Sequence, residues 1–77
     1  MSHVTQGAVD AAFNVAVRRY EAGDLDAAMD IFRALALIAP TDGGVWRALA
    51  RCHEEVGEPE VADKLRWLGR ALTEGVS

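Results

Sequence analysis

The sequence predicts an all-α protein: two helix–turn–helix repeats whose four antiparallel helices form a right-handed stack. Two observations support this prediction. Apolar residues recur three and four positions apart, as on one face of a helix, and no run alternates apolar and polar residues as a strand would. In addition, the chain matches itself after a shift of 34 residues, which aligns Gly23 with Gly57 and Ala28 with Ala62. Each half therefore reads as one helical hairpin.

The first helix is expected over about residues 5–22, and it carries two apolar stripes. The first stripe consists of Ala8, Ala12, Val15, Ala16 and Arg19, and the second of Phe13, Val17 and Tyr20. A helix with two apolar faces is covered on two sides. We interpret the second stripe as surplus to the hairpin core, so that a partner or a second subunit covers it. The alternative is that the N-terminal segment folds back over it.

The second helix begins at Asp24, a good N-cap, and ends before Pro40, because proline pushes the preceding residue out of the helical region. Gly23 lies in the left-handed position that closes the first helix. The apolar stripe of the second helix consists of Leu25, Ala28, Ile31, Phe32, Leu35 and Ile38, widened by Met29 and Leu37.

The third helix follows Thr41 or Asp42 as N-cap, and its stripe consists of Trp46, Leu49, Ala50, His53 and Val56. Glu58 and Pro59 open a fourth helix, which we expect to end at Gly75. Its inner stripe consists of Val61, Ala62, Leu65, Leu68, Gly69 and Leu72. The prediction is one domain over residues 1–77, with repeats over about 9–42 and 43–76.

Composition narrows the possible functions. The chain has 12 acidic and 8 basic residues, a net charge of −4, and no basic stripe, so we expect no nucleic-acid partner. The single cysteine, Cys52, fits a reducing compartment. The first residues lack the apolar run of a signal peptide, and no stretch approaches the about 18 apolar residues that span a membrane. We therefore expect a cytoplasmic protein with no membrane insertion.

The repeat resembles the tetratricopeptide repeat, a helix pair of about 34 residues with the pattern W-x2-L-G-x2-Y…A-x3-F…P. The back half of this pattern is present in the first repeat as Ala28, Phe32 and Pro40, and the front half in the second as Trp46, Leu49, Ala50 and His53. The resemblance implies a module that binds a peptide on its concave face. Two repeats are fewer than the three that such stacks need, so something else is expected to complete the core.

A narrower resemblance rests on the run from Tyr20 to Ala28, on Ile31-Phe32-Arg33-Ala34-Leu35, and on Leu49-Ala50-Arg51-Cys52. These segments are similar to the class II chaperones of type III secretion, small tetratricopeptide proteins that hold translocator subunits in the cytoplasm. The resemblance implies a chaperone that shields an apolar segment of a client or co-chaperone. The competing hypothesis is a self-associating scaffold that forms a homodimer without a role in secretion.

The candidate binding residues follow from matching the repeat motif. On the concave face we predict contacts from Phe13, Asn14, Val17, Tyr20, Arg47 and Arg51. The motif match also places Asp10, Glu21, Ala48, Glu54 and Glu55 on this face. The two arginines lie one turn apart and could hold an anion in fork geometry, although a solvated face paired with Glu54 and Glu55 is the plainer alternative.

A second interface is predicted at Trp67 and Ala71 on the fourth helix, because an aromatic residue on a terminal helix suggests docking. The alternative is that Trp67 folds over the end of the stack. We predict no enzyme, no catalytic residue, no cofactor and no metal, because the sequence has no phosphate loop and no Ser/His/Asp set. Cys52 and His53 project to different faces, so they do not form a metal pair.

Overall fold

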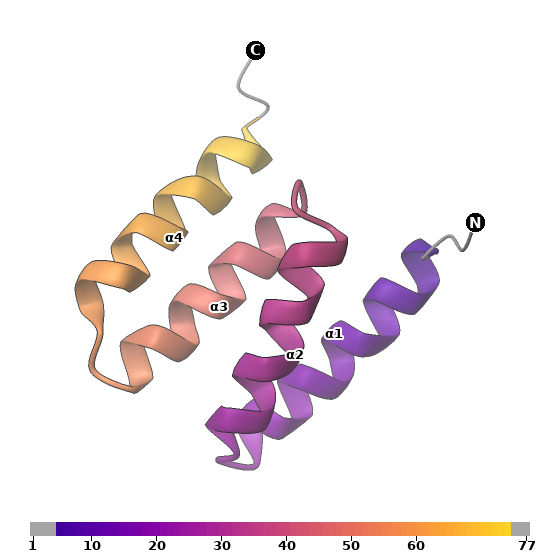
Figure 1. Ribbon diagram of the computed structural model, residues 1–77, viewed down its shortest axis with the longest axis horizontal. Coiled ribbons are helices and arrows are strands. Elements are labelled where there is room, and N and C mark those ends of the chain that lie inside the picture. The colour runs from indigo at the N-terminus through magenta and orange to yellow at the C-terminus, as the bar shows by residue number, and fades with distance from the viewer. Residues whose placement is uncertain (1–4, 75–77) are drawn as a thin grey trace.

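Four helices and no strand make up residues 5–74, the part of the chain that the computed structural model describes (Figure 1). The helices are α1 (Gln6–Glu21), α2 (Leu25–Ile38), α3 (Gly43–Glu55) and α4 (Pro59–Thr73). The predicted all-α fold with two helical hairpins is confirmed. The expected helix end at Gly75 lies outside the described residues, and α4 ends at Thr73 with Glu74 as its C-cap.

Local sequence signals explain where the helices begin and end. The side chains of Thr5, Asp24 and Asp42 each accept a hydrogen bond from a backbone N–H in the first turn of α1, α2 and α3. These bonds satisfy amides that have no partner within the helix. Gly23 and Gly57 both have a backbone φ of +84°, a value that residues with a side chain rarely adopt. Glycine therefore permits the tight turns that close the two hairpins.

Close packing joins α1 to α2, α2 to α3, and α3 to α4. Each hairpin is therefore a pair of neighbours, and the α2–α3 contact connects the two pairs. The molecule is thin, with principal extents of 38 × 32 × 17 Å. A continuous core runs through it, formed by Val9, Ala16, Ala28, Met29, Phe32, Leu35, Ala36, Val45, Leu49 and Cys52. Because α2 lies against both α1 and α3, half of these core residues come from this one helix.

The orientation of α1 differs from the first expectation. Val9 and Ala16 are buried, whereas Ala8, Val15 and Arg19 of the expected first stripe are exposed. Ala12 and Ala16 of that stripe do face the core, and the second stripe of Phe13, Val17 and Tyr20 also packs half-buried against it. Burying the larger side chains removes more apolar surface from water than burying alanines does. The triplet therefore contributes to the core, contrary to its interpretation as surplus, but its remaining exposed surface lines an open groove that the described residues do not cover.

In the other helices most of the residues predicted to face inward are at least partly buried, but those near the helix ends are exposed. Leu37, Ile38, Val56 and Val61 are exposed, with Leu37 85 % accessible. They lie near helix ends, where the neighbouring helices have diverged or the chain is turning (Figure 1). Buried residues that the stripes missed are Ala36, Val45 and Cys52.

Helices α3 and α4 approach each other closely at two glycines. A Cβ atom added to Gly43 would lie 2.5 Å from the carbonyl oxygen of Gly69 and would also collide with Thr73 Oγ1. A Cβ on Gly69 would lie 2.9 Å from the carbonyl oxygen of Gly43. Glycine at both positions lets the second hairpin close, which explains why a residue that disfavours helices occurs inside α4.

We predict that Gly43→Ala destabilises the protein by about 1–3 kcal/mol, although alanine is the better helix former, because the new methyl group forces the two helices apart. The matched control is Gly7→Ala, also in the first turn of a helix. A Cβ there meets only Thr5 Oγ1, at 3.8 Å, so the change should be neutral or stabilising. Urea unfolding measures both, and equal stability of the two variants would contradict the close approach.

Candidate functional site

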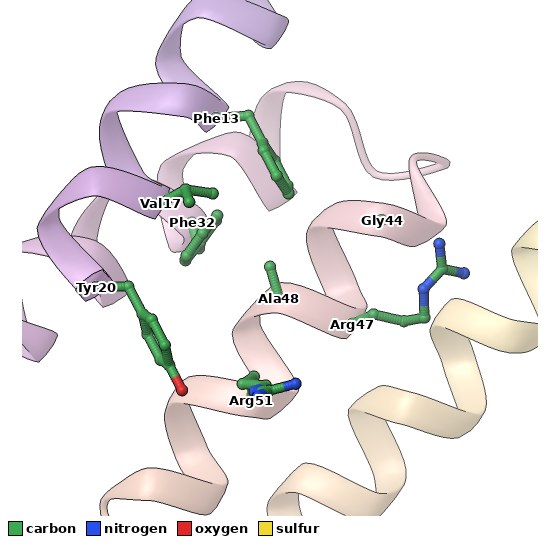
Figure 2. A pocket seen from close by; sticks show the side chains of 8 residues that line it. All are labelled: Phe13, Val17, Tyr20, Phe32, Gly44, Arg47, Ala48 and Arg51. Atoms are coloured by element: carbon green, nitrogen blue, oxygen red, sulfur yellow. The ribbon is translucent and has the colours of Figure 1, made fainter.

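An open groove of about 390 Å³ lies between α1 and α3 (Figure 2). Its lining residues are Phe13, Val17 and Tyr20 from α1, Phe32 from α2, and Gly44, Arg47, Ala48 and Arg51 from α3. The walls are mainly apolar, with polar atoms at the rim. A groove of this volume and character is typical of a ligand or peptide site.

The groove exists because α1 and α3 are held apart by the helix between them. Phe32 of α2, only 2 % exposed, forms its floor, and its ring meets that of Phe13 edge to face with centroids 5.3 Å apart. Opposite Phe13 and Val17, α3 presents the small side chain of Ala48 (Figure 2). A small residue at this place leaves room for a side chain from another molecule.

The structure brings together five of the six residues predicted for the concave face. Phe13, Val17, Tyr20, Arg47 and Arg51 all line the groove. Asn14 is exposed on α1 and is not among the lining residues. It follows Phe13 by one position, about 100° around the helix, so that it points away from the cavity.

Two lining residues were missed as contributors to the site: Phe32 and Gly44. Phe32 was assigned to the core, and it serves both the core and the groove. Gly44 has no side chain, so no apolar or charged pattern identifies it. Ala48, which the motif match places on the concave face, does line the groove.

Tyr20 and Arg51 close one end of the groove. The Tyr20 hydroxyl donates a hydrogen bond to Glu55 Oε1 at 3.0 Å, which ties the end of α1 to the end of α3. The pKa of the Arg51 guanidinium lies above its usual value, mainly because of a side-chain hydrogen bond with Tyr20 and the charge of the Tyr20 phenolate that forms at high pH, with smaller contributions from the charges of Glu55 and Glu54. Arg51 therefore stays cationic at every pH at which the fold is of interest.

Arg47 lies at the rim on the side of α4. Its guanidinium donates a hydrogen bond to Thr73 Oγ1, and the side chain extends from α3 towards α4 (Figure 2). Glu54, which the plainer alternative paired with these arginines, forms an ion pair with Arg66 of α4 at 3.2 Å instead. Within residues 5–74, neither Arg47 nor Arg51 forms an ion pair.

The second predicted interface has a different character. Trp67 is 69 % exposed on α4 and borders a shallow hollow together with Asp63, Lys64 and Leu68. Ala71 is half-buried and does not line this hollow. Trp67 thus does not fold over the described part of the stack, and its large apolar surface is available for contact.

Cys52 and His53 occupy separate environments. Cys52 is fully buried, and burial raises the pKa of its thiol, assisted by the negative charge of Glu55. The Nδ1 atom of His53 lies 2.7 Å from Glu58 Oε1, an interaction that spans the α3–α4 turn. Among the described residues no three potential ligands come close enough to hold a metal ion. None of the described helices is both long enough and apolar enough to cross a membrane.

Comparison with protein families, with curated proteins and with solved structures found no match to this chain. The groove therefore has to be interpreted from its own geometry.

We predict that Tyr20→Phe lowers the free energy of unfolding by about 0.5–1 kcal/mol, the low end of the range for a hydrogen bond, because this bond is solvent-exposed. Urea unfolding of Tyr20→Phe, Glu55→Gln and the double variant measures the coupling. Losses that simply add in the double variant would show that the hydroxyl and the carboxylate do not interact.

Proposed function

We propose that the protein is a non-catalytic protein-binding module whose groove between α1 and α3 holds an apolar segment of a partner protein. The observation that supports this most directly is the state of the groove in the free chain. Phe13, Val17 and Tyr20 are only half-buried around an open cavity, so a side chain inserted there would remove further apolar surface from water. The occupant is an extended or helical segment, both of which fit a groove that follows two helices.

The narrower proposal is a small chaperone of tetratricopeptide type that shields an apolar segment of a type III secretion client or co-chaperone in the cytoplasm. It is supported by the resemblance carried by the run from Tyr20 to Leu35, and by the groove at the face where such repeats hold peptides. Shielding would prevent the segment from associating before export, because exposed apolar surface drives aggregation.

The test is co-expression with the products of genes that neighbour its own, including any secretion-system genes, followed by purification and mass measurement of the complex. We expect a stable complex that Val17→Asp abolishes, because a carboxylate in the groove would have to be desolvated. Asn14→Asp is the matched control: it introduces the same side chain on the same helix, outside the groove, and should leave the complex intact. Circular dichroism establishes that both variants remain folded.

A complex that survives Val17→Asp would place the partner elsewhere and overturn the groove as the site. Failure to form any complex with neighbouring secretion-system products would reject the chaperone proposal. A complex with a neighbour that has no role in secretion would retain the binding module and reject only its narrower assignment.

The second candidate function is a self-associating scaffold, which the exposure of Trp67 favours. An indole 69 % exposed beside Leu68 is the kind of residue that supplies interface energy in dimers. In this hypothesis Trp67 packs against a second copy, and the triplet Phe13, Val17 and Tyr20 contributes to the dimer.

Light scattering on Trp67→Ala and Phe13→Asp separates the two candidates. The scaffold predicts a wild-type dimer that Trp67→Ala shifts towards monomer, by about 2 kcal/mol or more if the indole is a central contact. A monomeric wild type would exclude it. A dimer that persists in Phe13→Asp would remove α1 from the interface.

A further inference from the structure

The rim of the groove carries positive charge in a chain whose net charge is −4. Arg47 and Arg51 project from the same face of α3, one helical turn apart, on either side of Ala48. Both are exposed. Although the protein as a whole is acidic, the two guanidinium groups make the edge of the apolar groove complementary to a negatively charged partner.

Three carboxylates near this rim accept hydrogen bonds from other donors, although the charges of Glu54 and Glu55 still act on Arg51. Asp42 accepts the backbone N–H of Gly44 at 3.0 Å as the N-cap of α3. At the other end, Glu55 accepts the Tyr20 hydroxyl, and Glu54 pairs with Arg66. The two rim arginines are thus left without an ion pair inside residues 5–74, although each has five N–H donors.

The hydrogen bond from Arg47 to Thr73 strengthens this argument. Threonine is neutral, so the bond fixes the position of the guanidinium without cancelling its charge. Thr73 Oγ1 in turn donates to the carbonyl oxygen of Gly69 at 2.9 Å, which orients the hydroxyl so that it can accept from Arg47. A pre-positioned guanidinium loses less side-chain entropy when it binds an anion.

We propose that the groove selects partner segments in which an acidic side chain lies within about one helical turn of the bulky apolar residue that fills the cavity. The carboxylate binds at the rim to Arg47 and Arg51 while the apolar side chain enters between Phe13, Val17 and Ala48. This inference rests on the proposed function, since it specifies the chemistry of the segment that the groove holds.

The test uses a display library of random 12-residue peptides, selected on the wild-type protein in 50 mM NaCl, where surface charges are weakly screened. We expect enrichment of Asp or Glu within four positions of a large apolar residue. The best peptide is then synthesised with its acidic residue intact and with that residue changed to the corresponding amide. Fluorescence anisotropy measures the affinity of both peptides for four proteins: wild type, Arg47→Gln, Arg51→Gln and Arg18→Gln.

Each groove variant should weaken binding of the acidic peptide about three- to tenfold, as expected for one charge-assisted hydrogen bond at a rim. The amide peptide should be weaker on wild type and should lose little more on Arg47→Gln or Arg51→Gln, because the interacting pair is already broken. Arg18→Gln is the matched control. It removes the same charge from an exposed position on α1 outside the groove, and it should change affinity less than twofold.

Peptides that require Val17 but show no acidic enrichment, or no coupling to either rim arginine, would overturn this inference and leave the proposed function standing. If no peptide is selected, or if the selected peptides bind equally well to Val17→Asp, both fail. A dimer in solution that Val17→Asp dissociates and no peptide displaces would show that a second copy occupies the groove, which also overturns the inference.

Discussion

The burial of Phe32 is the constraint on which both the fold and the groove depend. This side chain lies on α2, the helix that packs against both α1 and α3, and it is 2 % exposed. Its edge-to-face contact with Phe13 fixes the first hairpin, and the core around it continues to Leu49 and Cys52 in the second. The same ring is the floor of the groove. Because its floor belongs to the buried core, the shape of the groove depends on the same packing that holds the fold together.

Much of the fold could be predicted because its signals are local. The caps at Asp24 and Asp42, the left-handed glycines, and Pro59 at the start of α4 depend on a few neighbouring residues. The orientation of α1 could not be predicted from its own residues. The helix has two apolar stripes, and how deeply each is buried depends on the space that Phe32 and Ala48 leave on other helices. Most lining residues on α1 and α3 could be named from the repeat motif. Phe32, which forms the floor of the groove, could not, because it lies on a third helix.

Polar interactions across helices were the least predictable part. Trp46 was expected as an apolar core residue, and its indole Nε1 also donates to the carbonyl oxygen of Pro40 at 2.7 Å, which holds the turn between the hairpins. Glu54 was considered a partner for arginines on its own helix but pairs with Arg66 on α4. Such pairs join residues that lie 6 and 12 positions apart, beyond the three- and four-residue spacing of one helix. Such pairs can be identified only once the conformation of the turns between the helices is known.

Comparison of the two repeats also explains why further copies of the hairpins would not extend the stack head to tail. Shifted by 34 positions, three buried residues of α2 correspond to charged residues of α4: Met29, Phe32 and Ala36 align with Asp63, Arg66 and Arg70. In the same way, three buried residues of α3 correspond to exposed residues of α1: Val45, Leu49 and Cys52 align with Ala11, Val15 and Arg18. If a second copy continued the stack head to tail, the charged residues of α4 would contact Ala11, Val15 and Arg18 of that copy. Burying charged side chains there is costly, and a polar outer helix is how repeat stacks are terminated. Continuation of the stack through the repeat interface is therefore disfavoured, and the groove between α1 and α3 is an apolar surface apart from that interface which the described hairpins leave open.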